Sequence, residues 1–345
     1  PEQHTVTFHD DRVVPVFPMK DADLVAMSIF TPQANRAMEL ADQYRALGVP
    51  VVAGGIFTSL MPDEIAPHVD ALCIGEGENV WPQIIADAEA GQLKPRYRGD
   101  EPVDLASIAP PRYELYVDWV DEMRRQRLVD YPDLDFPLQI VRGCSMSCDH
   151  CVVPCYLGNE MRLMPPEKVR ECFEKILSMG EWRGATLTED TSSLPSPLIQ
   201  RHFTAVAEAC ADLDTTISYV GSSPHFMRAV KDSFFEATRS LGVLEAYLMF
   251  GFGPTSRNAT AHDATEKDIQ ICVDTMKRCQ DNGLEVYASF SVGHEREDES
   301  VFDRVLEICR RANIRVAEFA VATPYPGTPA WYRIVEQDRL LGRPW

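Results

Sequence analysis

The chain has no long apolar run. Its 345 residues are 45% hydrophobic, yet no stretch of about 18 apolar residues without charge occurs, so the sequence predicts no membrane-spanning helix. It also shows no secretory signal peptide. The length favours two domains, and the apolar content is sufficient for a sizeable core. Together these features lead us to expect a cytoplasmic protein. The first residues already resemble the middle of a fold, so we expect the first domain to begin before residue 1.

Basic residues are scarce. Lys and Arg number 33 against 53 Asp and Glu, which gives a formal net charge of −20. A field of this sign repels a phosphate backbone and therefore disfavours nucleic acid as a substrate. The acidic residues are spread along the chain, as on the surface of an ordinary soluble protein. Nucleic acid is therefore not expected as a partner, and a small-molecule substrate is expected instead.

The cysteines do not form a disulfide scaffold, because ten cysteines in a chain of this length are too few and too scattered. Six of them are expected to be small buried residues of the core: Cys73, Cys172, Cys210, Cys272, Cys279 and Cys309. The other four lie within twelve positions, in the sequence CSMSCDHCVVPC. This group calls for a different explanation.

Residues 1–95 alternate strand and helix patterns. Strands are expected at 4–11, 21–30, 49–55 and 70–78, and helices at 32–48, 63–69 and 79–91. Gly48 follows the last apolar position of the longest helix, as glycines at helix ends commonly do. Short apolar strands joined by helices predict a parallel, doubly wound (Rossmann-like) α/β sheet.

Residues 96–136 are rich in proline and charge and are expected to be a linker that ends in a helix at 117–128. From residue 137 the alternation resumes, with six strand–helix units that predict a partial (β/α)6 barrel of the TIM type. Strands are expected at 137–143, 184–190, 215–221, 244–251, 284–291 and 314–322, and helices at 166–180, 196–213, 224–242, 266–283 and 299–314. In such a barrel the chemistry gathers at the carboxyl ends of the strands, and the four cysteines follow the first strand.

Three explanations of the cysteines can be compared. Structural zinc usually needs two separate cysteine pairs or cysteine–histidine pairs, and no second pair is found elsewhere in the chain. A disulfide is disfavoured in a cytoplasmic protein. An iron–sulfur cluster fits better, because closely spaced thiolates on one loop can surround it. Three thiolates would leave one iron open to an outside group.

The sequence CSMSCDHC matches the C-x3-C-x2-C pattern of radical S-adenosylmethionine (SAM) enzymes, at the place where that family has it. The resemblance implies that Cys144, Cys148 and Cys151 bind a 4Fe–4S cluster whose fourth iron binds SAM. It also implies a non-ligand role for Cys155, since a fourth thiolate would block that iron. His150 stands where the family often has an aromatic residue, and its ring is expected to pack there.

Other segments are similar to SAM-binding parts of the same family. The sequence TLTED resembles the segment that holds the methionine amino group, so Glu189 and Asp190 are implied as acceptors. The sequence SFSVGHERED resembles the segment that contacts ribose and adenine, which implies Ser289, Ser291 and Gly293. The sequence ATPYPGTPAW resembles a rigid late-barrel loop of the cobalamin-type branch, with Pro326 and Gly327.

The first domain resembles the cobalamin-binding domains of that branch. The resemblance rests on a serine and two glycine-rich turns after successive strands, and it implies contacts from Ser28, Gly54, Gly55, Gly75, Glu76, Gly77 and Glu78. Glycines would let a flat ligand lie against bare backbone. The D-x-H-x-x-G motif that supplies a cobalt ligand in many such domains is not found, so no lower cobalt ligand is assigned.

The resemblance implies a cobalamin-dependent radical SAM enzyme with a cobalamin-binding domain at 1–95, a linker at 96–136 and a radical SAM barrel at 137–345. The first strand of the first domain and an extension after the barrel are expected to lie beyond the sequence. The implied reaction is reductive cleavage of SAM at the cluster to a 5′-deoxyadenosyl radical, which abstracts hydrogen from an unactivated carbon, with C-methylation as the leading outcome. The implied partner is a one-electron donor of the flavodoxin or ferredoxin type.

Several alternatives stay open. Oxidative cyclisation or rearrangement of a tetrapyrrole or another secondary metabolite would use the same cofactors. Methylthiolation usually needs three further cysteines in the first domain, where only Cys73 is present. A non-catalytic iron–sulfur carrier would use Cys155 as a fourth ligand. Tyr156, Phe252 and Trp331 could line a substrate cavity, although core or rim packing is the simpler interpretation for them.

Overall fold

The computed structural model describes residues 3–99, 101–127, 136–146, 148–180, 184–188, 196–250, 265–294 and 297–342. The chain forms two compact units, each assembled from segments that are distant in sequence. The four-stranded unit comprises His9–Ile108, Gly143–Met161 and Thr323–Trp345. The six-stranded unit comprises Pro1–Phe8, Ala109–Arg142 and Arg162–Ala322. The domain boundaries expected from the sequence remain a prediction.

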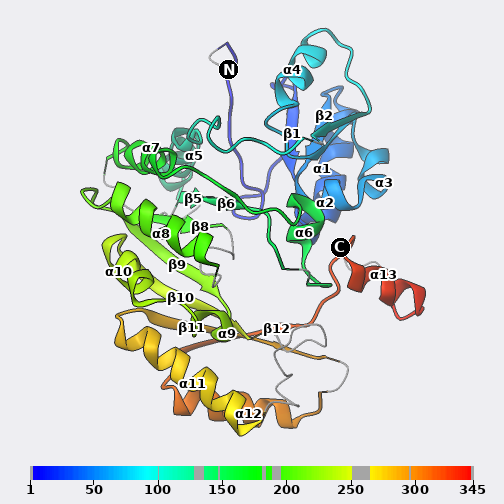
Figure 1. Cartoon of the computed structure of the whole chain (residues 1–345). Helices are drawn as coiled ribbons and strands as arrows, with labels where there is room; N and C mark the ends of the chain where they lie inside the picture. The colour runs from blue at the N-terminus through cyan, green and yellow to red at the C-terminus, as the bar shows by residue number, and fades with distance from the viewer. Residues whose placement is uncertain are drawn as a thin grey trace. The chain divides into compact units, whose positions relative to one another are not determined.

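The four-stranded unit is built on a parallel sheet in the order β1-β2-β3-β4 (Figure 1). Its strands are β1 (Val25–Ser28), β2 (Val51–Gly54), β3 (Ala71–Gly75) and β4 (Arg96–Gly99). The helices that join them are η1 (Thr31–Gln33), α1 (Ala34–Ala46), α2 (Gly55–Leu60), α3 (Pro62–Ile65), η2 (Ala66–His68) and α4 (Trp81–Glu89).

Helices cover both faces of this sheet. Alternate residues of a strand point to opposite faces, and the two buried clusters follow that period. Val51, Ala53 and Leu72 belong to a cluster with residues of α1 and α2, whereas Val52 and Cys73 pack in a second cluster that contains Ile84 of α4. The predicted doubly wound arrangement is thereby confirmed.

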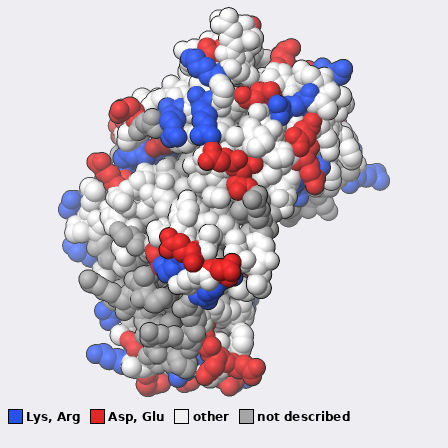
Figure 2. All heavy atoms as spheres, turned by 90° about the vertical axis from the view of Figure 1, so that its right-hand side faces the viewer, with Lys and Arg blue, Asp and Glu red and all other residues white. Residues whose placement is uncertain are grey.

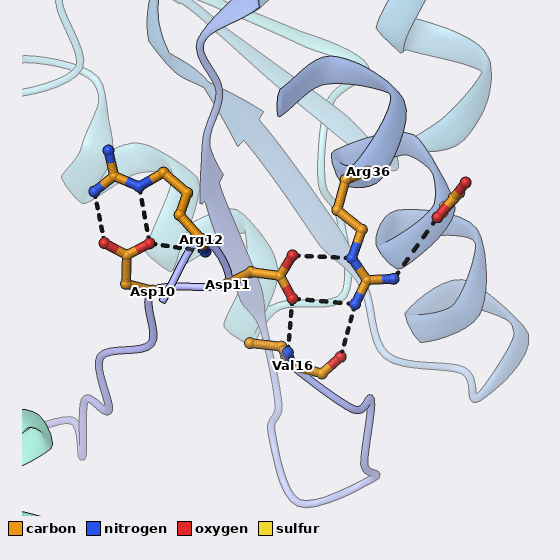
Figure 3. Close-up of polar contacts among 6 residues, drawn as sticks. Asp10, Asp11, Arg12, Val16 and Arg36 are labelled. Atoms are coloured by element: carbon orange, nitrogen blue, oxygen red, sulfur yellow. Dashed lines mark hydrogen bonds and ion pairs between the residues drawn. The ribbon is translucent and has the colours of Figure 1, made fainter. Parts of the chain in front are cut away.

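The segment that precedes β1 is attached to α1 by an ionic contact (Figure 3). The Arg36 guanidinium donates to both carboxylate oxygens of Asp11, at 2.9 and 3.1 Å, and to the carbonyl of Val16 at 3.0 Å. The Val16 N–H donates to the Asp11 carboxylate. These bonds to Arg36 lower the pKa of Asp11, so its carboxylate stays charged and keeps the segment in place.

The six-stranded unit is built on a parallel sheet in the order β12-β11-β10-β9-β8-β5. Its strands are β5 (Phe136–Leu138), β8 (Gly184–Leu187), β9 (Thr216–Ser222), β10 (Val243–Phe250), β11 (Glu285–Val292) and β12 (Val316–Val321). Its helices are α5 (Tyr113–Arg125), α7 (Pro166–Leu177), α8 (Pro197–Ala209), α9 (Pro224–Met227), α10 (Asp232–Ser240), α11 (Glu266–Asp281) and α12 (Ser300–Arg311). Sequential parallel strands joined by helices match the predicted partial barrel (Figure 1).

The structure departs from the expected elements in several places, and the strand expected at 137–143 is two strands, β5 and β6 (Val141–Arg142), which belong to different sheets. Residues 4–11 form no strand; instead Phe8 packs edge-on against Tyr116 and Trp119 of α5, so the period-two pattern was misleading. Strand β4 lies inside the expected linker. The sequence did not indicate it, because Tyr97 is the only buried residue of this strand and its pairing with β3 is a tertiary contact. The expected helix at 224–242 is two helices, α9 and α10.

The described helices include none that is long and apolar enough to cross a bilayer. On the face drawn in Figure 2, acidic and basic side chains of the described residues are interspersed rather than gathered in one area of a single sign.

Candidate metal centre and cofactor-binding edge

The cysteines lie on a loop that a short antiparallel pair closes at its base. Strand β6 (Val141–Arg142) pairs with β7 (Arg162–Leu163), and the Cys144 N–H donates to the Gly158 carbonyl at 3.2 Å. Gly143 has a φ of +82°, and a side chain there would overlap the carbonyl oxygen of Glu160. The loop can therefore close only with glycine at position 143. The helix α6 (Val152–Leu157) follows the third cysteine.

The thiols of Cys144, Cys148 and Cys151 are half-buried, whereas Cys155 is exposed. Burial raises the pKa of Cys148, and Cys144 and Asp149 add to the shift. The Cys151 sulfur accepts a hydrogen bond from the Val153 N–H at 3.4 Å. The raised pKa disfavours the thiolate form of Cys148. A bound metal cation would stabilise that thiolate.

The geometry bears on which metal centre fits. Three thiolates on one zinc ion at about 2.3 Å would have their sulfurs within about 4 Å of one another. The described residues, which include all four clustered cysteines, hold no group of three His, Cys, Asp or Glu side chains that could bind one metal ion. A cluster offers a separate iron to each thiolate, so it asks for less proximity. The soft sulfur donors on one closed loop fit an iron–sulfur cluster.

Asp149, between the second and third cysteines, fastens the loop to the last helix of the chain, α13 (Pro329–Glu336). Its carboxylate accepts a hydrogen bond from Arg333 at 2.8 Å, and its backbone carbonyl accepts one from the Ala330 N–H at 2.9 Å. The neighbouring His150 ring lies 3.4 Å from the same carboxylate and is mostly exposed. The expected packing of His150 as an aromatic ring remains a prediction.

The residues expected to contact cobalamin gather at one edge of the four-stranded sheet. Ser28, Gly54 and Gly75 end neighbouring parallel strands, so they lie at the same carboxyl edge. The Gly54 carbonyl accepts from the Ile29 N–H at 3.0 Å and from the Thr58 hydroxyl at 2.9 Å. The structure thus brings these strand ends together.

The positions that follow continue this edge. Gly55 has a φ of +90°, and a side chain there would lie 2.7 Å from the Ile29 nitrogen. Glu76 is buried, with 7% of its surface exposed, and Gly77 and Glu78 follow it before α4. The contacts of these residues with cobalamin remain a prediction.

Two of the residues expected to contact SAM, Glu189 and Asp190, lie outside the described residues, as does Phe252, the candidate for a substrate cavity. Ser289 is buried in β11, with 5% of its surface exposed. Ser291 and Gly293 lie at the carboxyl end of that strand, where the Ser291 hydroxyl is 3.0 Å from the His294 ring. The period of two places both serines on one strand face, as predicted.

The sequence interpretation missed Glu297 in this loop. Its carboxylate accepts hydrogen bonds from the N–H groups of Gly293, at 2.7 Å, and His294, at 3.0 Å. These bonds fix the turn after β11. The signal available in the sequence was a glycine followed four positions later by a glutamate, which is weak by itself.

A row of tyrosines on the six-stranded sheet was also missed. The rings of Tyr219, Tyr247 and Tyr287 lie 5.6 and 5.3 Å apart in succession, and the Tyr247 hydroxyl donates to Glu318 at 3.3 Å. Burial and the nearby Glu318 raise the pKa of Tyr287. Ser289 is in register with Glu318, so the row shares its sheet face with one of the predicted SAM contacts.

The late loop lies in the four-stranded unit. Gly327 has a φ of +82°, and a side chain there would be 2.6 Å from the Leu60 side chain; Pro326 is buried beside it. Trp331 is 4% exposed and packs in the core cluster of α1 and α2, so core packing is the correct interpretation for it. Tyr156 of α6 donates to the Gly75 carbonyl at 3.4 Å.

Comparison with known proteins agrees with this geometry. The B12 binding domain family matches residues 4–85, and the radical SAM superfamily matches residues 138–316, which is 179 of the 345 residues. The bacteriochlorophyllide d C-8(2)-methyltransferase of Chlorobaculum tepidum is 24% identical over 344 residues, covering 94% of this chain and 71% of that protein.

Two further proteins extend the comparison. The anaerobic magnesium-protoporphyrin IX monomethyl ester cyclase of Rubrivivax gelatinosus is 22% identical, covering 88% of this chain and 57% of that protein. The radical SAM methyltransferase TsrM of Kitasatospora setae, solved with tryptophan and a SAM analogue, has the same fold. Its TM-score is 0.67 at 16% identity, over 92% of this chain and 66% of that one.

The family matches, the cysteine loop and the glycine edge agree with one another. The chain therefore belongs to the radical SAM superfamily, and it is a cobalamin-type enzyme of that superfamily that uses a 4Fe–4S cluster, SAM and cobalamin.

Proposed function

We propose that the enzyme methylates an unactivated carbon of a small molecule. The observation that carries the proposal is that the cysteine loop and the glycine edge belong to one compact unit. The two are in direct contact through the hydrogen bond of Tyr156 to the Gly75 carbonyl. Two cofactors bound at these places would be held close enough to serve one substrate.

The roles of this chain's residues follow from their positions. Cys144, Cys148 and Cys151 would hold the 4Fe–4S cluster, and SAM would bind at the same cluster. The exposed Cys155 stays free of the metal, and its thiol donates to the Cys151 carbonyl at 3.6 Å. Together the cofactors supply one-electron activation of SAM and a carrier for a methyl group.

The remaining contacts are assigned by the resemblance and by strand position. Ser289, Ser291 and Gly293 orient the nucleoside of SAM at the end of β11, with Glu297 fixing their turn through two backbone N–H groups. Glu189 and Asp190 accept hydrogen bonds from the methionine ammonium. Ser28, Gly54, Gly55 and the residues Gly75, Glu76, Gly77 and Glu78 provide the surface for cobalamin. Pro326 and Gly327 hold the late loop against Leu60.

The substrate class and partners complete the proposal. The relatives named above act, by their names, on a bacteriochlorophyllide and a magnesium porphyrin, so a tetrapyrrole is the first substrate to test, with a lipid as the second. We infer that a flavodoxin or ferredoxin delivers the electron and that the enzyme works in the cytoplasm.

The test is anaerobic reconstitution with iron, sulfide and cobalamin, followed by reaction with SAM that carries a deuterated methyl group. Methylation predicts that the label appears in the product and that 5′-deoxyadenosine forms with it. Oxidative cyclisation, the second candidate, predicts 5′-deoxyadenosine and a product that has lost hydrogen and carries no label. No SAM cleavage with any tetrapyrrole or lipid, from a chain that binds both metal cofactors, would contradict both.

A further inference from the structure

The loop that carries the cysteines is held by the last helix of its own unit. Trp331, on the first turn of α13, is buried among the core residues of the four-stranded unit. Thr328 caps this helix by accepting from the Trp331 N–H at 3.2 Å. The helix is therefore fixed to the core through the buried Trp331 ring. Its other residues can hold a neighbouring segment in a defined position.

This helix contacts the cysteine loop at Asp149. The Ala330 N–H, which has no acceptor within its own helix because it lies in the first turn, donates to the Asp149 carbonyl at 2.9 Å. Three residues further along, Arg333 donates to the Asp149 carboxylate at 2.8 Å. Asp149 is thus gripped at its backbone and at its side chain, between Cys148 and Cys151.

The charges at this point matter for a metal centre. The Asp149 carboxylate is only 18% exposed, whereas Arg333 is 48% exposed. An unpaired anion next to Cys148 would oppose the addition of an electron to a cluster bound there. The Arg333 guanidinium, 2.8 Å from that carboxylate, offsets this effect.

We propose that Arg333 is a positioning residue for the cysteine loop and raises the reduction potential of the cluster that this loop binds. The proposal rests on the assignment of Cys144, Cys148 and Cys151 as cluster ligands. It gives α13 a role in holding the cysteine loop and in setting the reduction potential of the cluster. The cysteine spacing and the glycine-rich strand ends do not by themselves indicate this role.

The experiment compares reduction potentials of the reconstituted cluster by electron paramagnetic resonance, at fixed applied potentials and without substrate. In Arg333→Met we expect the ratio of reduced to oxidised cluster to fall about tenfold, which is about 59 mV for a one-electron couple. Arg333→Lys keeps the charge and should stay within about threefold of the parent. Arg339→Met, on the same segment with a bond to Gln337, is the matched control and should change the ratio by less than about twofold.

A charge effect and a purely structural one are separated by the partner residue. Asp149→Asn should shift the ratio the opposite way, and Asp149→Asn combined with Arg333→Met should return it close to the parent value, because the pair is then neutral again. The positioning role of Arg333 is tested separately. In the cluster-free Arg333→Met chain, the backbone N–H groups of residues 144–158 should exchange hydrogen faster than in the cluster-free parent.

Two results overturn the inference and are distinguishable. If the parent binds the cluster and Arg333→Met keeps the parent ratio, Arg333 does not tune the centre. The same conclusion follows if the double variant is no closer to the parent than Arg333→Met. If the parent chain binds no cluster at all, the cysteine assignment itself fails, and the role of Arg333 fails with it.

Discussion

Replacing either of two adjacent glycines at the proposed cobalamin edge with alanine should affect stability very differently. Gly55 has a φ of +90°, and an added methyl group would lie 2.7 Å from the Ile29 nitrogen and 2.9 Å from its oxygen. Both atoms are backbone atoms already engaged in hydrogen bonds, with Gly54 and Phe57, so neither can move cheaply. Gly54 is extended, with a φ of −139°, and its added methyl group would meet only Cys73, at 3.6 Å.

The magnitudes follow from these geometries. Gly55→Ala adds about 1–2 kcal/mol for the left-handed conformation and about 1–3 kcal/mol for displacing the Ile29 backbone, so we expect a loss of about 2–4 kcal/mol. Gly54→Ala should change the free energy of unfolding by less than about 1 kcal/mol, and it can be favourable because the unfolded chain loses freedom.

Urea unfolding of the cofactor-free chain, followed by far-UV circular dichroism, measures both values. Equal losses in the two variants would refute the reasoning from backbone geometry. The Gly54→Ala and Gly54→Leu chains, once urea unfolding shows that they are folded, then test function separately. Both should bind cobalamin more weakly than the parent, Leu more so, with an unchanged iron content. Undiminished cobalamin binding by Gly54→Leu would remove the case for this surface.

The remaining predictions concern the cluster, one buried histidine and the last helix. Cys148→Ala should abolish the brown chromophore and 5′-deoxyadenosine formation, whereas Cys155→Ala should keep its iron; iron analysis and SAM cleavage check both, and loss of iron in Cys155→Ala would contradict the assigned role. Burial lowers the pKa of His202, so below about pH 6.5 the unfolded chain takes up a proton before the folded chain does. As the pH falls below that value, the free energy of unfolding of the parent should decrease by up to about 1.4 kcal/mol per pH unit, and His202→Gln should not show this decrease. Identical pH dependence of the unfolding free energy of the two chains in urea would argue against this. Trp331→Ala should cost about 3–5 kcal/mol in the same assay, and a loss below about 1 kcal/mol would show that α13 is not anchored by its ring.

Much of the fold could be predicted from local patterns. Parallel strands joined by helices leave strong signals, because buried strands are short and apolar and helices repeat every 3.6 residues. The helix that ends before Gly48 and the five strands from β8 to β12 are examples. The patterns failed where pairing depends on distant residues. Residues 4–11 alternate like a strand but pair with none of the described strands, and β4 has little alternation but pairs with β3.

The candidate site divides in the same way. The spacing of Cys144, Cys148 and Cys151 is a local property, because a loop that surrounds a cluster needs closely spaced thiolates, and the sequence alone indicated the metal and the family. Contacts between side chains and backbone groups left little signal of their own. Glu297 was missed because its role is to accept two backbone N–H groups, which depends on the shape of the turn after β11.

The sequence by itself determined the order of strands and helices, the cysteine spacing and the glycine-rich strand ends, since each of these is set by neighbouring residues. Only the tertiary structure decided that the cysteine loop and the last helix join the four-stranded unit. The contacts responsible, Arg333 with Asp149 and Tyr156 with Gly75, connect residues 184 and 81 positions apart. No local pattern of apolarity or turn residues encodes such a pairing, because its free energy arises only when the whole chain has folded.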